Sequence, residues 1–276
     1  MRSLTHVISG DGPKAQALPD VYPPLSARDI KFRRGQVVMI AAQPNGGKSM
    51  LALHYLIHSG VDGLYISADT DPTTTMLRAA ATILGKTMSE VEHACSTDSG
   101  LVFVQEALDG LQERIRFCFD PSPSINDIAM EIEAWNSLFG QPPTLLVVDN
   151  LMNIVSGNDN EFMAMREHCV ALHHISRVTN SSVWVLHHVS ENESRATMPA
   201  PRRALHGKVS QLPEMILTLA MDPHSNQLKI CAVKNRHGPH DATGEDFEVL
   251  YVDPSRMSIY SSQMEMATAA KRREWE

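Results

Sequence analysis

The chain has 276 residues, 43% of them hydrophobic and 20% charged, which is enough apolar sequence for one large α/β domain or two small ones. Its formal net charge of −8 disfavours coating nucleic acid through bulk positive charge, so any nucleic-acid binding must use local basic loops. The four cysteines lack zinc-ribbon or Cys-x-x-Cys spacing, and no apolar run nears the roughly 20 residues of a membrane span, which predicts a cytoplasmic protein without a membrane partner.

Residues 1–30 are rich in glycine, proline, serine and aspartate, and this composition predicts an N-terminal arm or linker. Beyond them, apolar runs of strand length alternate with segments whose apolar residues recur at helical spacing. Asp71 and Pro72 form a start signal for the second of these helices. The predicted strands are 36–42, 63–69, 115–120, 144–150 and 182–188, and the predicted helices are 48–59, 73–84, 124–139 and 161–180.

The chain changes character after residue 188, where short strands follow one another with only turns between them. Consecutive short strands favour antiparallel pairs, whereas the alternating elements before them favour a parallel sheet. We therefore predict an α/β fold with a mostly parallel central sheet, flanking helices and an antiparallel β extension. The domain is expected over residues 31–262, followed by a helical or frayed tail at 263–276. The predicted strands of the extension are 214–222, 227–235, 246–253 and 257–260.

A strand, a tight glycine-containing loop and a helix follow one another directly in the stretch IAAQPNGGKS, residues 40–49. Backbone N–H groups in such a loop converge on phosphate oxygens, the lysine reaches the outer phosphates, and the serine coordinates Mg²⁺. The first glycine of the usual motif is replaced by alanine, whose small side chain still suits the exit from the strand. The alternative is a glycine-rich turn without a ligand. The predicted nucleotide-binding residues are Ala42, Gln43, Pro44, Asn45, Gly46, Gly47, Lys48 and Ser49.

An acidic residue later in the sequence supports this interpretation. The apolar strand 144–150 carries Asp149 near its end, about 100 residues after the loop. A carboxylate at the end of a central strand beside a phosphate loop holds Mg²⁺ and its water shell. We therefore predict that Ser49 and Asp149 form the metal site and that the cofactors are ATP and Mg²⁺. The alternative is that Asp149 is only a turn residue.

The loop IAAQPNGGKS resembles that of DnaB-type replicative helicases, which also carry Ala-x-x-Pro before the Gly-Lys pair. In that family the alanine is a normal variant. The string LYISADTDPTTTMLR is similar to the family's second strand, where a glutamate precedes an arginine by nine residues. The resemblance places Asp69 at the position of this water-activating glutamate, with Arg78 nine residues later. Aspartate is one methylene shorter, which predicts that the water is held less well.

Two further strings extend the resemblance to about residues 30–260. KNRHGP, residues 234–239, resembles the Lys-Asn-Arg-x-Gly string of DnaB and RadA, both members of the RecA-like P-loop superfamily. The resemblance implies that Lys234 and Arg236 reach the γ-phosphate bound by a neighbouring subunit. VWVLHHVSE resembles the corresponding strand end of these proteins, which implies that His188 links the γ-phosphate to the loop beyond.

The loop after this strand is basic in an otherwise acidic protein. RecA-like proteins bind single-stranded DNA through the loops that follow the strands ending here at Asp149 and His188. The resemblance therefore implies that the segment RATMPAPRRALHGK, with four basic residues and no acidic one, follows one DNA strand. The alternative is an ordinary solvated surface loop. The predicted DNA-binding residues are Arg195, Arg202, Arg203 and Lys208.

The histidines allow a metal interpretation, which we do not favour. His237 and His240 lie close to Asp241 in the sequence, but a two-metal nuclease centre needs several clustered carboxylates and none is evident. Structural or solvent-exposed histidines are the simpler interpretation.

These inferences lead to one functional expectation with two alternatives. We expect a RecA-like ATPase that hydrolyses ATP at subunit interfaces of a ring, expected to be a hexamer, and acts on single-stranded DNA as a helicase or translocase. The first alternative is a recombination or strand-annealing protein that uses ATP as an assembly switch and forms filaments. The second is a structure-specific nuclease on the same fold.

Overall fold

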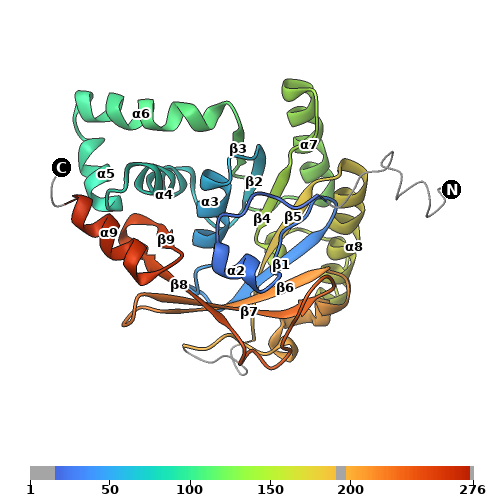
Figure 1. The fold of residues 1–276 in the computed structure, drawn as a ribbon. Coiled ribbons are helices and arrows are strands. Elements are labelled where there is room, and N and C mark those ends of the chain that lie inside the picture. Colours follow the sequence, from blue (N-terminus) through green and yellow to red (C-terminus); the bar gives the residue numbers. More distant parts are fainter. Residues whose placement is uncertain (1–15, 191–196, 274–276) are drawn as a thin grey trace.

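The computed structural model describes residues 16–190 and 197–273, without the side chains of 206–208. Within these residues nine strands form one sheet in the order β3-β2-β4-β5-β1-β6-β7-β8-β9 (Figure 1). Neighbouring strands from β3 to β6 are parallel, and the pairs from β6 to β9 are antiparallel. This arrangement confirms the predicted parallel sheet with an antiparallel extension. The strands are β1 (Val37–Ala42), β2 (Gly63–Ser67), β3 (Ile115–Cys118), β4 (Leu145–Asp149), β5 (Ser182–His188), β6 (Met215–Asp222), β7 (Gln227–Asn235), β8 (Glu248–Asp253) and β9 (Ser258–Tyr260).

The helices follow the predicted pattern except at residues 85–114 and at the short helix α2 within the predicted arm. Residues 85–114 were not assigned to any element, yet they form two helices, which begin behind Thr87 and Thr97 as side-chain caps. The four predicted internal helices are present, and Asp71 caps α4 as expected. The α-helices are α2 (Pro23–Ala27), α3 (Lys48–His58), α4 (Pro72–Leu84), α5 (Met88–Ala94), α6 (Asp98–Gln112), α7 (Ile125–Phe139), α8 (Glu161–Thr179) and α9 (Gln263–Arg273). Short 3-10 turns are η1 (Leu151–Asn153), η3 (Arg202–Ala204), η4 (His206–Gln211) and η5 (Pro254–Arg256).

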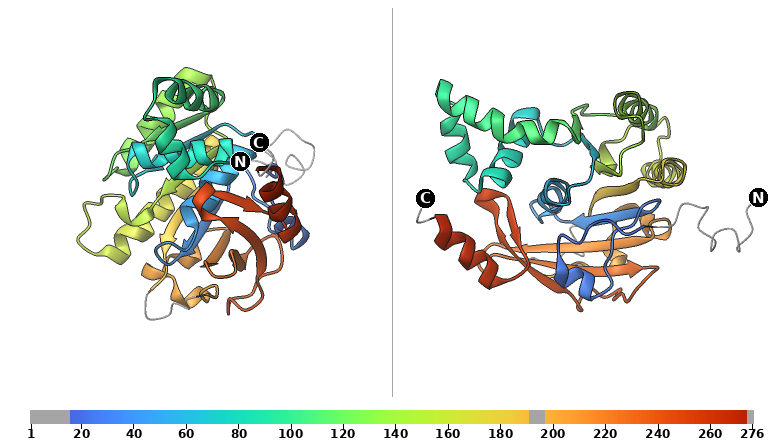
Figure 2. Two further views of the ribbon diagram at one scale, coloured as in Figure 1. Left: turned by 90° about the vertical axis from the view of Figure 1, so that its left-hand side faces the viewer. Right: turned by 45° about the horizontal axis from the view of Figure 1, so that its top comes forward.

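The central strand β1 is buried on both faces, which is why its sequence is a continuous apolar run. Val38 and Ile40 belong to the core shared with α3, while Val37 and Met39 belong to the core shared with α7 and α8. Figure 2 shows α3 on one side of the parallel strands and α7 and α8 on the other. Two hydrophobic layers thus hold β1, and the loop that leaves it, in a fixed position.

The described part of the N-terminal arm packs on the domain. Leu18, Tyr22 and Leu25 are buried in the same core as α3, and the N–H of Leu18 donates to the carbonyl of Phe32 at 2.8 Å. The glycine and proline content of this segment suggested a linker, but its spaced apolar side chains supply enough buried surface to dock it. Residues 1–15 of the predicted arm lie outside the described residues.

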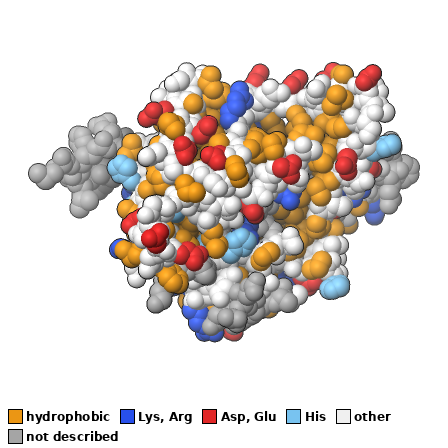
Figure 3. Space-filling view, turned by 180° about the vertical axis from the view of Figure 1, so that it is seen from behind, with side chains coloured by type: hydrophobic (Ala, Val, Ile, Leu, Met, Phe, Trp, Pro, Cys, Tyr) orange, Lys and Arg blue, Asp and Glu red, His pale blue; other side chains and the backbone are white. Residues whose placement is uncertain are grey.

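The surface carries the acidic balance of the sequence. The face opposite to that of Figure 1 shows carboxylates spread over it and basic side chains gathered in few places (Figure 3). No helix in the described part of the chain combines the length and the apolarity needed to cross a membrane.

Candidate functional site

An open cavity of about 400 Å³ lies at the carboxyl edge of the parallel strands. Residues 44–50 of the loop after β1 line it, together with Asp69 after β2, Asp149 at the end of β4 and His188 at the end of β5. Because parallel strands end at the same edge of a sheet, side chains separated by more than 100 positions meet here. The structure therefore brings Lys48, Ser49 and these three residues of the sequence prediction together.

The loop after β1 has the backbone geometry of an anion cradle. Gly47 is the residue before α3, with a φ of 89°, and no side chain caps the N–H groups of the helix. A Cβ on Gly46 would lie 2.6 Å from the Cβ of Ala42, and one on Gly47 would lie 2.9 Å from Leu228. Both glycines are therefore required by close contacts. The uncapped N–H groups at the start of a helix favour phosphate oxygens.

The surroundings of Ala42 explain why alanine can replace the first glycine of the usual motif. Its side chain is fully buried and packs directly against Gly46, so there is room for one methyl group at this position. A larger side chain would push the loop away from the strand. The alanine thus preserves the loop geometry that the usual glycine serves.

Lys48 lies folded across the inside of the loop. Its Nζ donates to the carbonyl oxygens of Gln43 at 3.0 Å and Ala42 at 3.3 Å. Burial lowers the pKa of Lys48, while the nearby carboxylates of Asp149 and Asp69 act in the opposite direction. The ammonium group is thus partly desolvated within the loop, where a phosphate oxygen would interact with it more strongly than in water.

Ser49 and Asp149 are in direct contact. The Ser49 hydroxyl donates to the Asp149 carboxylate at 2.6 Å, and the Tyr65 hydroxyl donates to the same oxygen at 2.8 Å. Burial raises the pKa of Asp149, although both hydrogen bonds oppose this change. A hydroxyl and a carboxylate side by side fit Mg²⁺, which binds few protein oxygens and completes its shell with phosphates and water. Tyr65 was missed because a tyrosine within an apolar strand gives no signal other than that of a core residue.

The remaining cavity residues come from several elements. Asp69 is exposed at the rim, and Arg78 of α4 donates to the hydroxyl of Thr70 at 3.3 Å. The Nε2 of His188 lies 3.5 Å from the side-chain amide of Asn150, the residue after Asp149. His188 is therefore in contact with the end of the strand that carries the carboxylate. The sequence analysis also missed Met221, Pro254 and Met257, which reach the cavity from the antiparallel extension.

Lys234 and Arg236 do not lie in this cavity. Leu228, near the start of β7, is the residue that a Cβ on Gly47 would meet, so this end of β7 touches the loop. Arg236 lies eight positions farther along the strand, and at about 3.3 Å per residue more than roughly 20 Å separates it from Leu228. Neither cation can reach the phosphate loop of its own chain.

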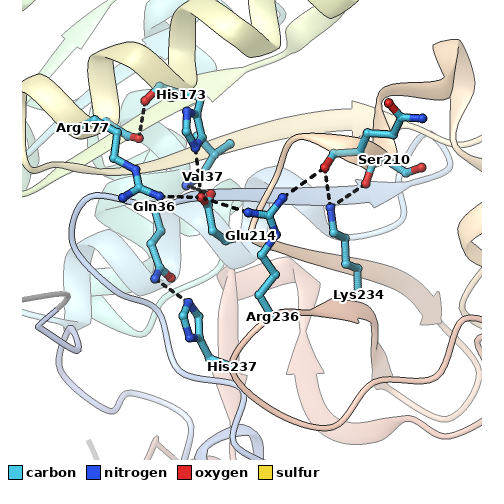
Figure 4. Close-up of polar contacts among 11 residues, drawn as sticks. Gln36, Val37, His173, Arg177, Ser210, Glu214, Lys234, Arg236 and His237 are labelled. Atoms are coloured by element: carbon cyan, nitrogen blue, oxygen red, sulfur yellow. Dashed lines mark hydrogen bonds and ion pairs between the residues drawn. The ribbon is translucent and has the colours of Figure 1, made fainter. Parts of the chain in front are cut away.

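The two cations are held at the opposite edge of the sheet (Figure 4). Lys234 Nζ donates to the carbonyl oxygens of Ser210 and Gln211, both at 2.8 Å, and Arg236 donates to Gln211 at 3.3 Å. Burial lowers the pKa of Lys234 to about 8, with further lowering by Arg236 and Arg202. The predicted DNA-binding Arg202 is thus close enough to Lys234 to act on its charge.

The other predicted DNA-binding residues are placed only in part. Arg202 and Arg203 are exposed in η3, at the end of a loop that the bridge between Val189 and Leu205 closes. Lys208 belongs to η4, and its side chain is not among those described. Arg195 lies outside the described residues.

The histidines and carboxylates of the described residues form no group of three or more that could hold a metal. His237 Nε2 contacts the side chain of Gln36 at 2.8 Å. The carboxylate of Asp241 accepts backbone N–H groups of its own turn, from Thr243, Glu245 and Asp246. These contacts give both residues structural roles in the turns after β7.

Comparisons with known proteins agree with this geometry. Residues 21–194 match the family model described as AAA domain. The gene 65 protein of Mycobacterium phage L5 is 34% identical over 254 residues, which are 90% of this chain and 94% of the relative. A solved DnaB-like replicative helicase, described with its interactions with primase, matches with a TM-score of 0.77 at 17% identity, over 93% of this chain and 64% of that chain. The RadB recombinase matches with a TM-score of 0.60 at 18% identity, over 89% of this chain and all of that chain (100%).

Proposed function

The chain belongs to the AAA domain family and has the RecA-like P-loop ATPase fold, and from this premise we propose that it hydrolyses ATP at subunit interfaces and moves along single-stranded DNA. The proposal makes it a helicase or translocase that assembles as a ring, expected to be a hexamer. The observation that carries it is that the predicted catalytic residues lie at two opposite edges of one sheet.

The carboxyl edge of the parallel strands, which carries Lys48, Ser49 and Asp149 and is here called the first edge, would bind the nucleotide. The loop N–H groups and the Lys48 ammonium would hold the phosphates, and Ser49 and Asp149 would hold Mg²⁺. Bound there, Mg²⁺ neutralises phosphate charge. Asp69, at the rim of the same cavity, would accept a hydrogen bond from the attacking water and orient it. The aspartate side chain is one methylene shorter than glutamate, so its carboxylate reaches less far toward the water and should hold it less well.

The opposite edge, which carries Lys234 and Arg236 and is here called the second edge, would supply positive charge to the nucleotide of a neighbouring subunit. Along β7, Lys234 lies roughly 20 Å and Arg236 roughly 26 Å from Leu228, the residue beside their own loop, so a role at the γ-phosphate requires a second subunit. A cation of this kind is worth about 10³-fold or more in rate. A site completed in this way makes hydrolysis dependent on assembly.

Support for DNA as the substrate comes from similarity and from charge. The solved structure with the higher TM-score of the two is that of a DnaB-like replicative helicase, and the phosphate loop and the Lys-Asn-Arg string resemble the same group. Arg202 and Arg203 are exposed after β5, and Arg202 acts on Lys234. A DNA strand bound by this loop would therefore lie near the cations that serve the neighbouring nucleotide.

The experiment measures ATP hydrolysis with and without single-stranded DNA, and strand displacement on a forked duplex. We expect DNA to stimulate hydrolysis, and we expect unwinding that requires ATP. Electron microscopy with ATP and a long single strand then separates the alternatives. Closed rings support the helicase, whereas continuous filaments without unwinding support the recombination or annealing alternative and contradict the proposal.

A mixing experiment tests the shared site directly. Arg236→Ala and Lys48→Ala should each be nearly inactive alone. Mixed before assembly, they form interfaces in which an intact loop faces an intact arginine, so part of the ATPase activity should return. An arginine that acts within its own chain predicts no recovery at any ratio, once co-assembly has been shown by pull-down of differently tagged subunits.

A further inference from the structure

Glu214 is a buried carboxylate next to the two cations of the second edge. It directly precedes β6, and its side chain is only 3% exposed. Its Oε2 accepts the N–H of Val37 at 3.0 Å, and its Oε1 lies 3.0 Å from His173 Nε2 and 3.1 Å from the guanidinium of Arg177. Arg236 approaches the same oxygen at 3.9 Å (Figure 4). One buried acid thus gathers three basic side chains, two from α8 and one from the turn after β7.

The contacts with Arg236 differ from the others in kind. The backbone N–H of Arg236 donates to the backbone carbonyl of Glu214 at 3.0 Å, which fixes where the side chain starts. Both arginine side chains are about half exposed, but the Arg236 guanidinium is the farthest of the three basic groups from the Glu214 carboxylate, at 3.9 Å. Because a long ion pair with an exposed partner is screened and weak, this pair orients the guanidinium without binding it tightly.

Because Glu214 keeps its other partners, Arg236 can leave it with little loss of stability. A buried carboxylate that loses its only partner strongly destabilises the fold, whereas one that stays hydrogen-bonded does not. Burial by itself raises the pKa of Glu214, but the Val37 N–H, His173 and Arg177 outweigh it, so this pKa lies below its ordinary value. The carboxylate therefore remains charged and satisfied whether or not Arg236 is present.

We propose that Glu214 is a positioning residue for catalysis at the neighbouring subunit: it aims the Arg236 guanidinium outward, and when Arg236 turns to the neighbour's phosphate, Arg177 still compensates its charge while His173 and the Val37 N–H stay in contact with it. The inference rests on the proposed function, in which Arg236 acts across the interface. It adds the acid that sets the arginine and the neighbouring groups that allow the arginine to leave.

The test is Glu214→Gln, which keeps the shape of the side chain and removes its charge. Misplacing a catalytic group by about 1 Å can cost about 10²-fold, so we expect kcat to fall by between about 10-fold and 10²-fold. KM for ATP should stay within about twofold, because the loop that binds ATP is untouched. Glu214→Gln combined with Arg236→Ala should be no slower than Arg236→Ala alone, since both changes act through one group. An exposed acid on α7, Glu133→Gln, serves as the matched control and should keep the wild-type rate.

Subunit mixing separates positioning from a structural role. Glu214 also contacts Val37 at the start of β1, so a structural defect would pass along β1 to the loop of the same chain. Positioning predicts that Glu214→Gln mixed with Lys48→Ala regains activity, whereas Glu214→Gln mixed with Arg236→Ala does not. A structural defect predicts no recovery with Lys48→Ala. If Glu214→Gln fails to fold, Glu214→Asp, which keeps the charge and withdraws it by one methylene, takes its place in the same mixtures.

Two outcomes overturn the inference, and they are distinguishable. A wild-type rate for Glu214→Gln while Arg236→Ala is inactive removes the positioning role and leaves the proposed function intact. A wild-type rate for Arg236→Ala removes the interfacial role of the arginine, and the positioning role with it.

Discussion

Lys48 at the first edge and Lys234 at the second are both hydrogen-bonded to backbone carbonyls, but the charges around them have opposite signs. Lys48 donates to two loop carbonyls, and Lys234 donates to two carbonyls of η4. Burial lowers the pKa of both. The carboxylates of Asp149 and Asp69 counteract this at Lys48, whereas Arg236 and Arg202 add to it at Lys234, where only Glu214 opposes them.

The difference shows how one chain can carry two halves of a site. The edge at Lys48 contains its own acids, which suit a cation and a triphosphate together. The edge at Lys234 has an excess of positive charge beside a single buried acid, and that excess favours an anion supplied from outside. In the proposed function neither edge is complete for hydrolysis, and the distance along β7 would prevent one chain from joining them.

The most damaging change is predicted at the first edge. Lys48→Ala removes the charge that serves the phosphates both before and during reaction, so ATP turnover should fall by about 10³-fold or more. The fold should survive, because Lys48 is held by two carbonyls of its own loop and not by the hydrophobic core. Steady-state ATPase with circular dichroism checks this, and Lys86→Ala on the exposed surface is the control. Wild-type turnover by a folded Lys48→Ala protein would rule out the site.

The next largest effect is expected at Asp69, which is the solvent-exposed acid of the first edge, whereas Asp149 is buried. If Asp69 orients the attacking water, Asp69→Asn should lose about 10²-fold or more in kcat while ATP still binds. Asp69→Glu is the matched variant, and the longer side chain should raise kcat above that of the wild type. Single-turnover hydrolysis and nucleotide titration measure both quantities. Equal kcat values in all three proteins would remove Asp69 from the mechanism.

The second edge should make ATPase activity depend on pH in the range in which Lys234 loses its charge. Lys234, with a pKa of about 8, is charged below that pH and loses its charge above it. If the charge is needed, ATPase at pH 9 should be about tenfold below its plateau. Lys234→Arg should remove this decline, because arginine stays protonated.

The free energy of unfolding should instead increase over the same pH range in which activity falls. Between pH 8 and the ordinary lysine value of 10.5, the unfolded chain holds more protons on this group than the folded one. The contribution of Lys234 to the free energy of unfolding therefore rises with pH. Denaturant unfolding at pH 7.5 and 9, compared between wild type and Lys234→Arg, separates this effect from the loss of activity. A wild-type ATPase profile as flat as that of Lys234→Arg would contradict the assignment.

The smallest effects are expected at Ala42, a predicted nucleotide-binding residue that is buried beneath the loop and does not line the cavity. Ala42→Val adds two methyl groups against Gly46 and should destabilise the fold by about 1–3 kcal/mol and weaken ATP binding. Ala42→Gly should change stability by no more than about 1 kcal/mol, since it only removes a methyl group and adds backbone freedom. Thermal unfolding and nucleotide titration measure both variants. Equal stability for valine and alanine would mean that the loop is not closely packed here.

Local patterns in the sequence were sufficient for the fold class and for the first edge. Apolar runs and helical spacing identify elements because burial acts on each segment separately, and a loop between a buried strand and a helix is a contiguous unit. Lys48, Ser49 and Asp149 could be grouped because parallel strands end at one edge. The helices at 88–94 and 98–112 were missed although Val104, Leu108 and Leu111 recur at helical spacing, because the first is short and Gly100 and Gly110 lower the helix propensity of the second.

The second edge was decided by the tertiary structure alone. Lys234 and Arg236 could be recognised as a string, but nothing in the string shows that β7 carries them away from their own loop. Glu214 gave no signal either, since its partners Val37 and His173 lie 177 and 41 positions away and meet it only once β6 is placed beside β1. Tyr65 likewise reads as a core residue until β2 and β4 pair and bring its hydroxyl to Asp149. Sequence patterns record which residues are buried, whereas the order of strands in the sheet determines which buried polar groups become partners.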